Sequence, residues 1–167
     1  MQLFVERIST PIGAILLTHD GKLICNTEFE DCGRRERELA LHFPDATFTR
    51  ARRRSPFAEA LSRYFKGDIR AVDKLPVAKI GTPFQQRAWA ALRRIKPGET
   101  KSYGEQARAI GLPQAARAVG RANALNPNAI IVPCHRVRGS GGDLTGYGGG
   151  LERKRWLIEH EAKYARG

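Results

Sequence analysis

Residues 102–125 read SYGEQARAIGLPQAARAVGRANAL, and they give the strongest structural signal in the chain. Ser102 and Glu105 stand three positions apart in the pattern of a capping box, so a helix begins here and ends near Gly111. Pro113 then opens a second helix that fills the rest of the stretch. Two short helices joined by Gly-Leu-Pro are typical of a helix-turn-helix, with ordinary packing of two helices as the alternative.

Positive charge gathers in the same half of the sequence. The chain of 167 residues has 29 Lys and Arg against 17 Asp and Glu, a formal net charge of +12. Residues 1–78 hold 13 basic and 11 acidic side chains, whereas residues 79–167 hold 16 and 6. Such an excess favours a polyanionic partner, with nucleic acid first and a merely soluble basic protein as the alternative. We expect a polyanion to bind mainly the second half.

Around these helices the sequence predicts an α+β protein in two parts. In residues 1–78, a helix begins at Ser55-Pro56, and strand-like runs cover residues 3–8, 14–19, 22–27 and 46–50. In residues 79–167, a further capping box begins at Thr82, and helices predominate. We therefore expect a small N-terminal sheet-plus-helix domain with a linker over 1–78. A mostly helical DNA-binding domain with a helix-turn-helix is expected over 79–167.

Hydropathy and cysteine usage indicate the compartment. No apolar run approaches the roughly 20 residues of a membrane span, and the N-terminus lacks the layout of a signal peptide. We therefore expect a cytoplasmic protein with no membrane contact. Cys25, Cys32 and Cys134 are too few for a disulfide framework. His19 and His42 lie near the first two cysteines, but their spacing matches no standard zinc pattern, so we expect no bound metal.

The segment after the two helices carries the candidate chemistry. Residues 129–132, AIIV, predict a short buried strand, and Cys134 and His135 follow it. A thiol with a pKa of about 8.5 is mostly protonated at neutral pH, so a nucleophilic cysteine needs a base. Cys134, His135 and the later Glu161 supply a nucleophile, a base and an orienting carboxylate. On residue types alone, a structural cysteine beside a histidine is the commoner alternative.

The local geometry limits how Cys134 and His135 meet. Because neighbours in an extended chain point to opposite faces, His135 reaches Cys134 only if the backbone turns sharply or a water bridges the two side chains. Residues 139–150 then contain seven glycines and Tyr147, which predict a loop that folds closely over a ligand. This loop lacks the Gly-Lys-Ser/Thr of a phosphate-binding loop.

The segment Ile131–Val137, IVPCHRV, resembles the active-site signature of the O6-alkylguanine-DNA alkyltransferases, also called methylated-DNA–protein-cysteine methyltransferases. The resemblance runs in register from about Thr82 to Glu161, through TPFQ at 82–85, SY at 102–103, ARAVG at 116–120, TGY at 145–147 and HE at 160–161. The first half matches more loosely, at residues 10–13 and 64–67. The chain is most similar to the bacterial stand-alone members, which lack the N-terminal zinc domain of the adaptive-response regulator.

The resemblance implies DNA repair by direct, irreversible transfer of an alkyl group from O6-alkylguanine, and more weakly O4-alkylthymine, to Cys134. The transfer happens once per protein and needs no cofactor. By resemblance, His135 acts through a water to deprotonate Cys134, and Glu161 orients His135. Asn126 braces the active-site turn by hydrogen bonds.

The resemblance also implies a partner, double-stranded DNA containing alkylated bases. The helix-turn-helix of this family enters the minor groove, and the damaged nucleotide flips out of the stack. Arg117 would fill the gap, and Tyr103 would help to rotate the nucleotide. The residues expected to contact DNA or the flipped base are Ser102, Tyr103, Arg117, Arg121, Asn123, Val137, Tyr147 and Gly148. We expect the protein to act as a monomer, and the preferred lesion is left open because Gly148 stands where some members carry Ser.

Three other classes of protein share some of these features. A non-enzymatic sensor of alkylation damage lacks the acceptor, and here Cys134 is present. A Cys-His hydrolase needs an oxyanion hole and leaves the basic helix-turn-helix unexplained. A helix-turn-helix repressor is disfavoured by the Pro-Cys-His-Arg segment and by the lack of a second dimerising element.

Overall fold

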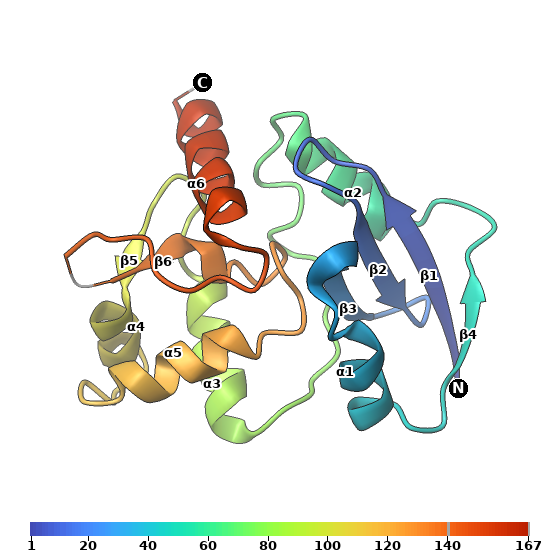
Figure 1. Ribbon diagram of the computed structural model, residues 1–167, viewed down its shortest axis with the longest axis horizontal. Coiled ribbons are helices and arrows are strands. Elements are labelled where there is room, and N and C mark those ends of the chain that lie inside the picture. The colour runs from blue at the N-terminus through green and yellow to red at the C-terminus, as the bar shows by residue number, and fades with distance from the viewer. Residues whose placement is uncertain (140, 167) are drawn as a thin grey trace.

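A four-stranded sheet forms one side of the molecule (Figure 1). The computed structural model describes residues 1–139 and 141–166. The sheet has the order β3-β2-β1-β4 and contains β1 (Gln2–Ile8), β2 (Ile15–His19), β3 (Ile24–Phe29) and β4 (Thr47–Arg50). β2 is antiparallel to both β1 and β3, whereas β4 lies parallel to β1. The α+β class and the four predicted strands are confirmed.

The strand predicted at residues 22–27 begins two residues later than expected. The Oδ1 atom of Asp20 accepts hydrogen bonds from the backbone N–H groups of Lys22 and Leu23, at 2.8 and 2.7 Å. Both residues therefore belong to the turn, and β3 begins at Ile24. Gly21 has a φ of 96°, a conformation that glycine adopts without steric cost.

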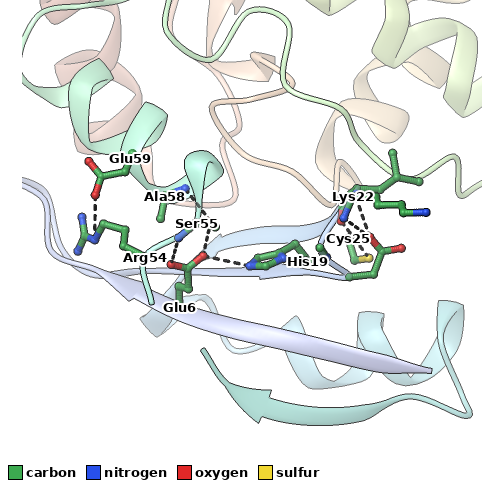
Figure 2. Close-up of polar contacts among 11 residues, drawn as sticks. Glu6, His19, Lys22, Cys25, Arg54, Ser55, Ala58 and Glu59 are labelled. Carbon is green, nitrogen blue, oxygen red and sulfur yellow. Dashed lines mark hydrogen bonds and ion pairs between the residues drawn. The ribbon is translucent and has the colours of Figure 1, made fainter. Parts of the chain in front are cut away.

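Polar contacts join the sheet to the helix that covers it (Figure 2). Ser55 caps α2 (Pro56–Phe65), since its Oγ accepts from the backbone N–H of Ala58 at 3.1 Å. Glu6 of β1 accepts from the backbone N–H of Ser55 at 2.8 Å and also from its hydroxyl. His19 of β2 lies 3.1 Å from the same carboxylate. The predicted N-cap is thus confirmed, and it is tied to the sheet by a buried carboxylate.

Helices dominate the second half of the chain, as predicted. They are α3 (Pro83–Arg93), α4 (Tyr103–Ala109), α5 (Ala116–Ala124) and α6 (Leu151–Ala165), while α1 (Arg35–His42) lies in the first half. The capping boxes at Thr82 and Ser102 are both present. α5 begins at Ala116 rather than at Pro113, without a side-chain cap. A two-stranded parallel ribbon, β5 (Lys101–Ser102) with β6 (Val137–Arg138), lies beside α4. None of the helices in the described ranges has the length and apolar character that a membrane crossing requires.

The strand predicted at residues 129–132 is wrong. The backbone N–H of Val132 donates to the carbonyl oxygen of Asn128 at 2.9 Å, and Ile130 has a φ of 72°. The segment therefore coils through tight turns and forms an isolated bridge between Asn128 and Thr27 of the sheet. It then passes into a short 3-10 helix at Cys134–Arg136. Apolar residues are buried there as expected, but local hydrogen bonds replace a strand ladder. The apolar pattern alone does not distinguish these cases.

The largest hydrophobic core takes residues from both halves of the chain. Ile8 of the sheet packs in one cluster with Leu61 and Tyr64 of α2, and Ile131 and Leu157 belong to the same cluster. The parts predicted over 1–78 and 79–167 therefore share a core. This shared core brings α2 of the first half together with Ile131, shortly before Cys134, and with α6.

Candidate active site

Cys134 stands at the wall of a cavity of about 310 Å³. Cys134 as a whole residue is partly exposed, while the residues immediately before and after it are buried. The cavity is lined by Arg34, Tyr103, Gly120, Asn123, Ala124, Cys134, Gly146, Tyr147 and Gly148. The lining thus combines the two helices α4 and α5, the glycine-rich loop and one arginine from the first half.

Asn126 holds the turn that presents Cys134. Its Nδ2 donates to the carbonyl oxygen of Val132 at 2.7 Å, and its Oδ1 accepts from the backbone N–H of Asn128 at 2.9 Å. The side chain is buried, and it lowers the pKa of the Cys134 thiol. Asn126 therefore hydrogen-bonds to two residues of the segment that leads to Cys134.

His135 points away from the cavity and into the protein. Its Nε2 lies 2.7 Å from Oε2 of Glu161 on α6, and both side chains are almost fully buried. In the part of the chain that the structure describes, Nδ1 of His135 has no hydrogen-bond partner, and no direct hydrogen bond joins His135 to Cys134. The expected separation of the two side chains is found, but it results from a 3-10 turn rather than from an extended chain.

Glu161 contacts three buried side chains, those of His135, Arg136 and Tyr64. Its Oε1 accepts from Nε of Arg136 at 2.8 Å, and its Oε2 accepts from Nη2 of Arg136 at 3.0 Å. The hydroxyl of Tyr64 donates to Oε2 at 2.6 Å. The sequence pairs Glu161 with His135 only, and it gives no local signal for Tyr64. Arg136 belongs to the Pro-Cys-His-Arg segment, so the sequence did offer a basic residue beside His135 as a second partner for Glu161.

Burial and charge set the proton affinities at the site. Burial raises the pKa of the Cys134 thiol, while the hydrogen bond to Asn126 and the charges of Lys154 and Arg34 act in the opposite direction. Burial also lowers the pKa of His135, and Glu161 only partly opposes this. Burial disfavours the charged form of Glu161, but His135 and Arg136 outweigh it and hold its pKa well below the usual range. The resting site therefore contains a protonated thiol, a neutral imidazole and a carboxylate at neutral pH.

Lys154 of α6 fixes the glycine-rich loop over the cavity. The buried Nζ donates to the carbonyl oxygen of Thr145 at 2.6 Å and lies 3.3 Å from that of Gly146. Tyr103 reaches the same loop, with its hydroxyl 3.3 Å from the Thr145 oxygen. A Cβ at Gly149 would lie 2.9 Å from the Phe29 ring, so only glycine lets the loop pack this closely.

The remaining expected DNA-contacting residues divide into two groups. Arg117 and Arg121 are exposed on α5. Asn123 of the same helix is largely buried but lines the cavity. Its amide exchanges hydrogen bonds of 2.8 and 3.0 Å with the amide of Gln106 on α4. Ser102 uses its hydroxyl to cap α4, and the side chain of Val137 is fully buried.

Arg34 is a cavity residue that the sequence reading missed. It precedes α1, and its Nη1 donates to the carbonyl oxygen of Ala124 at 2.5 Å, while its Nε lies 3.2 Å from the buried Glu28. The contact spans 90 positions in sequence, which no local pattern encodes. Within the described residues, no cluster of three or more His, Cys, Asp or Glu side chains forms that could hold a metal ion.

The sequence of this chain is similar to those of known proteins. A family model described as "6-O-methylguanine DNA methyltransferase, DNA binding domain" matches residues 83–163. The methylated-DNA–protein-cysteine methyltransferase of Salmonella typhimurium is 42% identical over 165 residues, 96% of each chain. The protein of the same name from Mycobacterium bovis is 46% identical and covers 95% of this chain and 92% of its own.

Solved structures of related proteins have the same fold. The O6-methylguanine methyltransferase of Mycobacterium tuberculosis superposes with a TM-score of 0.80 at 42% identity, over 97% of this chain and 94% of the other. A crystal structure of the same organism's OGT in complex with DNA gives a TM-score of 0.80 at 41% identity, over 98% and 94%. Similarity of this extent in both sequence and fold shows that the chain belongs to the family of the methylated-DNA–protein-cysteine methyltransferases.

Proposed function

We propose that this protein repairs alkylated DNA by taking the alkyl group of O6-alkylguanine, and more weakly of O4-alkylthymine, onto Cys134. The observation that carries the assignment is the position of Cys134, whose thiol stands at a cavity wall in front of the buried His135–Glu161 pair. The sulfur attacks the alkyl carbon in line with the carbon–oxygen bond. That bond breaks, its electron pair stays on the base oxygen, and the thiol proton ends on the guanine.

The proton leaves Cys134 through His135 in this proposal. A raised pKa keeps the thiol protonated at neutral pH, so the nucleophile needs a base. His135 is neutral at that pH because burial lowers its pKa, and Glu161 holds its Nε2. The other ring nitrogen, Nδ1, is then the acceptor, with a water as the bridge to Cys134. Asn126 braces the turn throughout.

The product is stable, so one protein acts once. A thioether on Cys134 offers water no good leaving group, and no co-substrate takes part because the damaged DNA is the alkyl donor. Each molecule is therefore consumed by a single transfer, and no cofactor is needed. We also propose that the protein is cytoplasmic and monomeric. Its free thiols suit a reducing compartment.

α4 and α5 form the DNA-binding helix-turn-helix in this proposal, and they face the minor groove. The exposed Arg117 and Arg121 lie on α5, which also contributes to the cavity wall. A nucleotide flipped out of the duplex enters the cavity between Tyr103 and the loop at Tyr147 and Gly148, and Arg117 fills the space it leaves. Flipping is required because the sulfur cannot reach the alkyl carbon in line while the base remains stacked.

The test is intact-mass measurement after mixing the protein with excess duplex that contains one O6-methylguanine. We expect a mass gain of one methylene group that saturates at one per protein, with the modified peptide containing Cys134. Cys134→Ala should bind the duplex without any gain. Cys25→Ala is the matched control, because burial raises the pKa of that thiol to about 11 and it should not react. Lesion binding by the unmodified wild type without mass gain would identify a damage sensor instead.

A further inference from the structure

Tyr64 is a buried titratable residue that the reaction described above does not use. It lies near the end of α2, in the first half of the chain, and its side chain is completely buried. Its hydroxyl donates to Oε2 of Glu161 at 2.6 Å, although the two residues are 97 positions apart in sequence. A buried tyrosine hydroxyl needs a partner, but here the partner is the carboxylate that holds His135.

The same carboxylate oxygen serves both Tyr64 and the candidate base. Oε2 of Glu161 accepts from the Tyr64 hydroxyl at 2.6 Å, from Nη2 of Arg136 at 3.0 Å, and lies 2.7 Å from Nε2 of His135. Oε1 is held by Nε of Arg136 at 2.8 Å. The Tyr64 hydroxyl and His135 therefore share the negative charge of one atom.

We propose that Tyr64 is a positioning residue that acts through Glu161 and sets how readily His135 accepts a proton. This inference rests on the proposed function only for its consequence on alkyl transfer. A hydrogen bond to a carboxylate stabilises the charge and draws electron density from the oxygen that receives it. With the hydroxyl present, Oε2 attracts a protonated His135 less strongly. Removing the hydroxyl concentrates charge on Oε2, stabilises the imidazolium and makes His135 a stronger base.

The other charged groups around this network stay in place when Tyr64 changes. Arg136 contacts Glu161 directly, and the charge of Lys154 on α6 lowers the pKa of His135. Asp73, after α2, and Tyr147, in the glycine-rich loop, lie close enough to Glu161 to feel its charge. These groups are the same in every variant. A change in the titration midpoint of His135 when one hydroxyl is removed therefore reports the Tyr64 contact.

The position of the ring is secured separately from the hydroxyl. The backbone carbonyl of Tyr64 lies 2.7 Å from Nε2 of His160, and the two rings are 5.3 Å apart. The ring also belongs to the main hydrophobic core. Tyr64→Phe keeps these contacts and removes only the hydroxyl, which makes it the informative variant.

The experiment follows the His135 imidazole by NMR across pH in the free protein, together with the single-turnover rate on O6-methylguanine duplex. For Tyr64→Phe we expect the His135 midpoint to rise by about 0.5–1 pH unit, the size of effect that one lost hydrogen bond to a carboxylate produces. The acidic limb of the rate profile should move in the same direction. Tyr164→Phe is the matched control, since Tyr164 lies on the same helix as Glu161 but is exposed.

A second variant changes the hydrogen bond in the opposite sense. Replacing Tyr64 by 3-fluorotyrosine makes the phenol a stronger donor, so the His135 midpoint should fall. The fluorinated phenol stays protonated, because burial and the neighbouring Glu161 raise the pKa of Tyr64 well above its usual value. This variant keeps the hydroxyl and the contact, so it also tests the proposal if Tyr64→Phe fails to fold.

The outcomes are separable. A His135 midpoint that stays at the wild-type value in Tyr64→Phe, or moves equally in Tyr164→Phe, overturns the inference, as does a shift in the same direction in the fluorinated protein. A lower melting temperature with an unchanged midpoint assigns Tyr64 a packing role only. Failure of the wild type to transfer any methyl group counts against the proposed function, while the NMR titration still decides the role of Tyr64.

Discussion

Nζ of Lys154 lies 2.6 Å from the carbonyl oxygen of Thr145, inside the protein rather than at its surface. A fully buried lysine is uncommon, and here its charge is spread over two loop carbonyls. The contact connects α6, which also carries Glu161, to the loop that closes the cavity.

Lys154→Met should loosen that loop without removing the helix. Methionine fills a similar volume but donates no hydrogen bond, so the Thr145 and Gly146 carbonyls lose their partner. We expect the transfer rate on O6-methylguanine duplex to fall about tenfold, the order of effect of one lost charged hydrogen bond. Lys163→Met, on an exposed position of the same helix, should transfer at the wild-type rate. Equal rates for the two variants would show that the loop needs no anchor.

Asn126→Ala should make Cys134 a poorer nucleophile at neutral pH. The variant removes both the bond that fixes Val132 and the hydrogen bond that lowers the pKa of the thiol. We expect the pH profile of Cys134 alkylation by iodoacetamide to move to higher pH, with at least several-fold slower reaction at pH 7. Asn128→Ala, in the same turn, removes a side chain that bonds to Thr27 instead and serves as the control. An unchanged profile in Asn126→Ala would limit this residue to a role in folding.

Arg117→Ala should slow alkyl transfer from duplex DNA without slowing transfer from the free base. Arg117 is exposed on α5 and has no contact with Glu161 or His135 among the described residues. We expect transfer from duplex DNA to fall more than tenfold, as for loss of a group worth about 1–3 kcal/mol in the complex. Transfer from a free O6-alkylguanine base should stay at the wild-type rate. Arg108→Ala, also exposed but on α4, is the control, and a parallel loss of free-base reaction would place Arg117 in the chemistry.

Stability should decrease as the solution becomes acidic. His135 has a lower pKa in the folded protein than its unfolded value near 6.5, so the unfolded state binds more protons below that pH. Glu161 is shifted downward too, and its contribution is present above about pH 4.3 and lost as pH falls further. We expect the melting temperature to decline from about pH 6.5 and to fall more steeply below about 4.3.

The histidine contribution to this decline can be isolated by substitution. His135→Gln removes the titrating ring, so the fall between pH 6.5 and 5 should become shallower, by at most about 1.4 kcal/mol per pH unit. His42→Gln, at a partly exposed position next to Glu38, should keep the wild-type slope. If His135→Gln melted with the same pH dependence as the wild type, the buried imidazole would not control acid sensitivity.

Much of the fold could be predicted from local sequence because its signals are local. The capping boxes at Thr82 and Ser102 each use two side chains three residues apart, and both helices begin where these patterns predict. The strand-like runs in the sequence predict the four strands of the sheet, with errors of one or two residues at their ends. The segment at 129–132 failed because its apolar residues are equally compatible with a strand and with buried turns.

The candidate site could be predicted only in part, because some of its contacts join residues that are far apart in the sequence. Cys134 and His135 are neighbours in one 3-10 turn, and Asn126 lies only eight positions before Cys134. Tyr64 and Arg34 join the site through contacts that span 97 and 90 positions. No periodicity or motif in their own segments encodes such contacts, since they depend on how α2 and α1 pack against the second half. The position of Asn123 on its helix likewise does not reveal its pairing with Gln106.

The bond between Tyr64 and Glu161 has a consequence for how the protein is made. We expect a contact that spans 97 positions to form after the local helices, because closing a long loop costs chain entropy before the contact stabilises it. The Glu161 carboxylate beside His135 therefore gains its Tyr64 partner only when α2 and α6 have come together. If His135 is the base, as proposed above, its carboxylate partner is assembled only when both halves of the chain have packed together. Slow folding of this chain would then delay the supply of competent repair protein, even while Cys134 is already present.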